Sequence, residues 1–174
     1  IFNILNLKKD DQVLLPSFIC KDLLSPMFNR GVTPVFYDVN KSLHPISFTE
    51  NKNIKAVIAV NYFGFPQDLK VFKTYCKKNK CVLIEDNAHG YLSRDEDNNL
   101  LGERGDFGIY SFRKTISICK IGMLSINNPF YINNKIIQIP FSKTGIGLKF
   151  QIKIFLIHLQ TLTKVKFVSY GENF

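Results

Sequence analysis

Two short apolar runs, residues 55–60 and 81–84, constrain the fold of this chain more than any other feature. They read KAVIAV and CVLI, and polar residues follow both. Runs that are apolar on both faces are typical of strands buried in a parallel sheet. Between them lies a helical pattern at 67–79, with Leu69, Phe72 and Cys76 at helical spacing. The segment therefore predicts a strand–helix–strand unit.

Further elements extend this alternation in both directions. The pattern of apolar residues and breakers predicts strands at 13–15, 34–39, 107–112 and 122–126, and a helix at 20–30 that ends at Gly31. Right-handed crossovers between parallel strands place helices on both faces of a sheet. The expected fold class is therefore α/β, with three layers (α/β/α) and a mostly parallel sheet.

The positive net charge is weak support for a nucleic-acid-binding function. The 174 residues carry 23 Lys and Arg against 14 Asp and Glu, a formal charge of +9. Residues 1–114 contribute +3 and residues 115–174 contribute +6. Lysine outnumbers arginine 19 to 4, whereas sites that read nucleic acid favour the bidentate guanidinium of arginine. A basic nucleic-acid-binding domain is thus the least supported hypothesis, and no nucleic-acid partner is expected.

Cysteine spacing and apolar segments bear on metal sites and location. The four cysteines include no CxxC pair and no zinc-ligand spacing, so we predict reduced thiols and no metal. The chain opens without a recognisable signal peptide, which favours a cytoplasmic protein. Its most apolar stretch, residues 152–159, is too short to cross a bilayer, and we expect no membrane association.

Polar residues gather where the predicted strands end. Asn61 follows the strand at 55–60, Asp86 and His89 follow 81–84, and Ser111 and Lys114 follow 107–110. In open α/β sheets, ligands bind at the carboxyl ends of the strands. These side chains therefore predict one ligand site.

The chemistry of three of these residues leaves two interpretations open for each. Lys114 has apolar neighbours in Tyr110 and Phe112, so it is either a desolvated Schiff-base nucleophile or an ordinary surface lysine. Asp86 follows four apolar residues and a glutamate, so its carboxylate must be hydrogen-bonded or paired, either in a helix cap or ion pair or with a ligand cation. His89 either contacts an aromatic ligand or has a structural role.

A set of longer segments carries a family resemblance. Between Asp11 and Leu124 the chain contains, in order, DQVLLPSFIC, GVTPVFYDVN, KAVIAVNYFGFPQDL, VLIEDNAHGYLS, LGERGDFGIYSFRKT and GML. Together they resemble the DegT/DnrJ/StrS family of sugar aminotransferases, which are pyridoxal-phosphate (PLP) enzymes of the aspartate-aminotransferase fold type. The resemblance implies a partial PLP-binding large domain at 1–130. Residues 131–174 do not match the family, and their dense apolar residues predict a divergent, helical C-terminal segment. We therefore expect a fragment of a fold type I large domain.

The resemblance also implies roles for the residues at the strand ends. Lys114 matches the lysine that forms the Schiff base with PLP and then moves the substrate proton. Asp86 matches the carboxylate that pairs with the pyridine nitrogen. His89 matches a position near the phenolic oxygen of PLP, and Ser111 matches a serine that binds its phosphate. Asn61 falls where the family usually has histidine, and it receives no role.

Some positions depart from the family pattern. Cys20 stands where an aromatic residue often stacks on the PLP ring, so Phe18 or His89 would have to replace it. Residues 120–122 read KIG where the family has an acidic residue and two glycines. The family's Gly-Thr-rich phosphate turn would precede Ile1.

The activity implied by the resemblance is transfer of an amino group from an amino acid such as glutamate to a nucleotide-linked keto-sugar. It implies a homodimer that serves nucleotide-sugar and polysaccharide biosynthesis. Two alternatives stay open, a truncated non-catalytic homologue that acts as a binding or assembly module, and a PLP-dependent sugar dehydratase. Since that dehydratase branch has histidine in place of the lysine, Lys114 favours amino transfer.

Overall fold

The structure, a computed structural model, describes residues 1–50, 53–115 and 122–132. The chain divides into two compact units, Ile1–Asn134 and Lys135–Phe174, and every described residue belongs to the first. The segment predicted to be helical at 131–174 therefore lies outside the described residues, apart from Tyr131 and Ile132.

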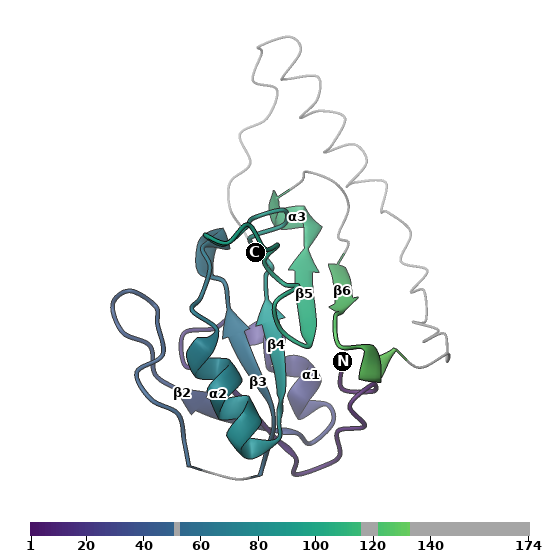
Figure 1. The fold of residues 1–174 in the computed structure, drawn as a ribbon. Coiled ribbons are helices and arrows are strands. Elements are labelled where there is room, and N and C mark those ends of the chain that lie inside the picture. The colour runs from purple at the N-terminus through teal and green to yellow at the C-terminus, as the bar shows by residue number, and fades with distance from the viewer. Residues whose placement is uncertain (51–52, 116–121, 133–174) are drawn as a thin grey trace, which may run out of the picture. The chain divides into compact units, whose positions relative to one another are not determined.

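A six-stranded sheet forms the centre of the first unit (Figure 1). Its strands are β1 (Gln12–Pro16), β2 (Thr33–Tyr37), β3 (Ile54–Val60), β4 (Val82–Asp86), β5 (Phe107–Ser111) and β6 (Gly122–Ile126). The spatial order is β2-β1-β3-β4-β5-β6, with parallel pairing throughout except between β5 and β6. The predicted α/β class with a mostly parallel sheet is confirmed.

The antiparallel pairing of β6 follows from the length of its connection. Residues 112–121 are all that separates β5 from β6. A crossover between parallel strands needs a dozen or more residues. The chain therefore returns beside β5 in the opposite direction.

Helices cover both faces of the sheet, as predicted. Successive residues of β1 belong to different core clusters, with Val13 and Leu15 in one and Leu14 in the other. Because side chains alternate along a strand, these clusters lie on opposite faces of the sheet. Helix α2 (Lys70–Asn79) packs on the Leu14 face through Phe72, whereas helix α1 (Ser25–Phe28) packs on the other face through Met27 (Figure 1).

The single helix predicted at 20–30 is wrong. The structure has a 3-10 turn, η1 (Lys21–Leu23), followed by the short α1. Pro26 lies in the first turn of α1, where its missing N–H costs nothing, whereas inside a longer helix it would clash with the preceding turn. Gly31 ends the segment with φ +66°, the left-handed conformation that glycine adopts without strain.

Other boundaries differ because short turns occupy strand ends. The strand predicted at 107–112 stops at Ser111, where helix α3 (Phe112–Thr115) begins. Two further 3-10 turns are η2 (Tyr62–Gly64), directly after β3, and η3 (Pro129–Tyr131), after β6. β4 extends through Glu85 and Asp86, which places both carboxylates within the sheet.

Candidate active site

A cavity of about 310 Å³ opens at the carboxyl ends of β3 and β4. Its lining comprises Phe18, Ile19, Cys20, Val60, Asn61, Tyr62, Phe63, Asp86, Ala88, His89 and Lys114. Three of the four predicted site residues therefore meet at one cavity, in the position where open α/β sheets bind ligands.

Asp86 supplies a buried carboxylate to this cavity. It is the last residue of β4 and pairs in register with Val60 and Ile109 on the neighbouring strands, which leaves it only 7% exposed. Within the described residues, one hydrogen bond reaches its carboxylate, from the backbone N–H of Ala88 at 3.0 Å. Burial raises the pKa of Asp86, while that hydrogen bond and the neighbouring side chains of Lys114 and His89 oppose the rise.

Lys114 and His89 contact each other beside Asp86. Lys114 Nζ lies 2.9 Å from His89 Nε2, and the His89 ring stacks on Phe63 with centroids 6.0 Å apart. Burial lowers the pKa of His89, and the Lys114 charge lowers it further, while Asp86 acts in the opposite direction. Because an ammonium group can only donate, the neutral ring accepts at Nε2 and carries its own proton on Nδ1. The histidine thus orients the lysine amine.

The surroundings of Lys114 and Ser111 differ from those of Asp86. Lys114 is exposed, because Phe112 packs on Tyr91 at 4.5 Å and Tyr110 turns inward to donate to the Leu101 carbonyl. These two aromatic neighbours therefore do not bury Lys114. Ser111 is half-buried in β5 and is not among the residues that line the cavity.

A second carboxylate, Glu85, was missed by the sequence reasoning. Its side chain is fully buried and accepts five hydrogen bonds: from Arg104 N, Nε and Nη2, from Gly105 N and from Asn61 Nδ2. Arg104 Nη2 lies 2.8 Å from Glu85 Oε2. A glutamate beside an otherwise apolar strand could have signalled a cationic partner, since unpaired buried charges are costly.

The same network explains Asn61, to which the sequence gave no role. Its amide donates to Glu85, and its Oδ1 accepts from Gln67 N and from Arg104 Nη2. Asn61 therefore ties the end of β3 to β4 and to the loop that carries Arg104.

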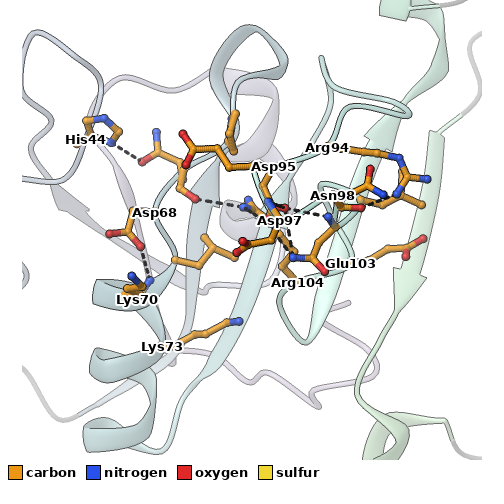
Figure 2. A pocket seen from close by; sticks show the side chains of 16 residues that line it. His44, Asp68, Lys70, Lys73, Arg94, Asp95, Asp97, Asn98, Glu103 and Arg104 are labelled. Carbon is orange, nitrogen blue, oxygen red and sulfur yellow. Dashed lines mark hydrogen bonds and ion pairs between the residues drawn. The ribbon is translucent and has the colours of Figure 1, made fainter.

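A larger hollow of about 920 Å³ lies between the start of α2 and residues 94–104 (Figure 2). Acidic and basic side chains line it together, and Arg104 there bonds to Asp95 at 3.3 Å, besides Glu85. Hydrogen bonding to Asn99 and Arg104 holds the pKa of Asp95 below its ordinary value, against the effect of burial. None of the four predicted site residues lines this hollow. The predicted site residues that line a cavity therefore line the smaller one.

The part of the chain that the structure describes offers neither a metal cluster nor a membrane-spanning helix. Over residues 1–50, 53–115 and 122–132, no group of three or more His, Cys, Asp or Glu is arranged to hold a metal ion. No helix in those same ranges has the length and apolarity needed to cross a membrane.

Similarity to known proteins defines the class. The fold is that of solved aminotransferases, among them one from Streptoalloteichus hindustanus (TM-score 0.63, 27% identity, covering 75% of this chain and 37% of that one). The model of the DegT/DnrJ/EryC1/StrS aminotransferase family matches residues 2–148. The chain belongs to this family, as its sequence segments predicted.

Individual relatives carry more than one activity. The GDP-perosamine synthase of Vibrio cholerae is 27% identical over 136 residues, which cover 74% of this chain and 37% of that protein. A GDP-4-keto-6-deoxymannose-3-dehydratase shares the fold at 22% identity (TM-score 0.59, covering 70% of this chain and 33% of that one). One structure of such a dehydratase contains a trapped PLP-glutamate geminal diamine. This chain thus spans little more than a third of the length of these relatives.

Proposed function

We propose that this chain is part of a PLP-dependent sugar aminotransferase in which Lys114 bonds to the cofactor. The observation that carries the proposal is the meeting of the Lys114 amine with the buried carboxylate of Asp86 and the ring of His89 at one cavity. The proposed substrates are a nucleotide-linked keto-sugar and an amino-acid donor such as glutamate.

The groups around the cavity fit PLP. Asp86 is a buried carboxylate with a single hydrogen bond from the described residues, so it retains capacity to accept from a protonated ring nitrogen. Lys114 offers a primary amine, the group that condenses with an aldehyde. PLP, when bound, supplies that aldehyde and a ring that withdraws electrons from the reacting carbon.

Each residue then has a defined task. Asp86 keeps the ring nitrogen protonated, which maintains its electron-withdrawing power. Lys114 would hold the cofactor through its amine and would move the proton at the substrate α-carbon. His89 holds the Lys114 amine at 2.9 Å, which limits the conformations of a flexible side chain.

Further elements of the proposal extend beyond the cavity lining. Ser111 is proposed to bind the cofactor phosphate, because it matches the serine that has this role in the family. A homodimer is proposed from the family. Between the two activities found among relatives, the presence of lysine at 114 favours amino transfer over dehydration.

Borohydride reduction in the presence of PLP tests the proposal. We expect a yellow absorbance band that disappears on reduction, and a pyridoxyl group on the peptide that contains Lys114, identified by mass spectrometry. Lys114→Ala should abolish both signals. Lys70→Ala is the matched control, because that lysine lines the other hollow.

Random modification would contradict the proposal. If PLP labelled Lys70 and Lys73 as readily as Lys114, the amine at the cavity would have no special reactivity. The competition is run at limiting PLP so that the preferred lysine is labelled first.

A further inference from the structure

The junction between α2 and β4 brings two cysteines together. α2 ends at Asn79, Lys80 adopts the left-handed conformation with φ +54°, and the N–H of Cys81 donates to the carbonyl of Cys76 at 3.1 Å. This is the hydrogen bond of a Schellman motif, whose two end residues commonly place their side chains in contact. Here both end residues are cysteines.

The packing of these two residues differs. Cys76 is buried in the core cluster between α2 and the sheet, and Cys81 packs against the same cluster while remaining half-exposed. Both cysteines are free, and hydrogen bonding between their thiols shifts the two pKa values in opposite directions. The Cys81 side chain is therefore partly accessible to a small oxidant, whereas the Cys76 side chain is buried.

We propose that Cys76 and Cys81 form a reversible redox pair, in which a hydroperoxide oxidises Cys81 and Cys76 then closes a disulfide. Neither cysteine lines the cavity that holds Asp86 and Lys114, so the inference is independent of the proposed function.

The electrostatics assign the two roles. The hydrogen bond with Cys76 lowers the pKa of Cys81, although burial opposes this. The hydrogen bond with Cys81, together with burial, raises the pKa of Cys76. Cys81 therefore loses its proton more readily than Cys76, and the thiolate is the nucleophilic form. An accessible thiolate beside a second cysteine is the usual arrangement of a redox-sensitive site.

The reaction balances with hydrogen peroxide as the oxidant. The Cys81 thiolate attacks one peroxide oxygen and the O–O bond breaks. Hydroxide leaves, and Cys81 becomes a sulfenic acid. The Cys76 sulfur then attacks the Cys81 sulfur, the S–O bond breaks, and a second hydroxide leaves. With the two thiol protons, two thiols and one peroxide give one disulfide and two waters. A thiol reductant reverses the step by exchange.

Peptide mapping of the full chain tests the pair. The folded protein is treated with hydrogen peroxide at low excess, alkylated and digested with trypsin, which cuts in the KKNK segment between the two cysteines. We expect a linked pair of peptides joining Cys76 to Cys81, lost on addition of dithiothreitol. The link should form while Cys20, an exposed cysteine, still reacts with iodoacetamide.

Two variants separate the roles. In Cys76→Ala, oxidation should stop at a Cys81 sulfenic acid, which dimedone traps. In Cys81→Ala, Cys76 should stay reduced for as long as the protein is folded, as monitored by circular dichroism. Cys76→Ser provides a second variant if the alanine change unfolds the chain.

Two results would overturn the inference. One is oxidation of Cys81 no faster than that of Cys20. The other is a link between Cys76 and Cys81 that forms only in urea. Either would show that the folded junction does not promote the reaction.

Discussion

Glu85 and Asp86 are neighbours in β4, yet their surroundings differ completely. Glu85 accepts five hydrogen bonds and pairs with Arg104, whereas the Asp86 carboxylate receives one hydrogen bond from the described residues. Successive side chains of a strand point to opposite faces. A carboxylate fully satisfied by its own chain serves the fold, and one that is buried but under-satisfied at a cavity is available to a ligand.

Loss of the Arg104 side chain should lower the free energy of unfolding more than any other change considered for these two carboxylates. Arg104→Ala leaves Glu85 buried without its cation, so we expect the free energy of unfolding to fall by about 3–5 kcal/mol. Urea denaturation measures it. Lys78→Ala breaks the exposed ion pair with Glu50 and is the matched control, with an expected loss below about 1 kcal/mol. Equal losses in the two variants would mean that the buried ion pair stabilises the fold no more than the exposed one.

A methyl group at Gly108 should have the next largest effect. An added Cβ would overlap the carbonyl oxygen of Gly102, in the loop that delivers Arg104 to Glu85. We expect Gly108→Ala to destabilise the protein by about 1–3 kcal/mol. Thermal unfolding measures the loss, and Gly122→Ala is the control because a Cβ there meets its nearest atom at 3.3 Å. An unchanged melting temperature in Gly108→Ala would show that this loop yields easily.

The contribution of Asp86 to the free energy of unfolding should depend on pH, with a smaller magnitude and a defined sign. Its pKa is raised on folding, so the native state binds the proton more readily than the unfolded chain. The stability of the wild type relative to Asp86→Asn should therefore be greatest below the unfolded carboxyl pKa. It should fall as the pH rises through the folded value, leaving the variant about 1 kcal/mol more stable at neutral pH. Urea denaturation across this pH range measures it, and a difference independent of pH would contradict the assignment.

The smallest expected effect is a change in the pKa of His89. Lys114→Met removes a cation that lowers the pKa of His89, so that pKa should rise. Titration of the imidazole signals by NMR measures the change, with His89→Gln to assign them and Lys70→Met as control. A pKa of His89 that does not move would show that the 2.9 Å contact has no electrostatic consequence.

The sequence predicted the strands better than it predicted their environment. Apolar β-branched runs located β3 and β4 because burial on both faces leaves an unmistakable pattern. The sequence reasoning stopped β4 before Glu85, since charged residues usually end a buried strand. The partner that keeps Glu85 inside, Arg104, lies 19 residues away in a loop with no periodic signal. Long-range pairing of this kind depends on the folded topology.

The site was predictable to the same degree. Asp86, His89 and Lys114 could be placed together because the ends of parallel strands share one edge of the sheet. The sequence left open whether Lys114 is exposed, because the answer depends on the packing of Phe112 on Tyr91, in a different segment. The position of Ser111 away from the cavity lining depends equally on where β5 ends and α3 begins.

The most direct measurement of this division between the two carboxylates uses two isosteric amide variants. Glu85→Gln and Asp86→Asn are unfolded in urea at neutral pH, each with and without PLP. Without PLP, we predict that Glu85→Gln is less stable than the wild type and that Asp86→Asn is more stable. Stabilisation by PLP should be lost in Asp86→Asn. Equal destabilisation by both changes would contradict the account, because it would give Asp86 the same structural role as Glu85.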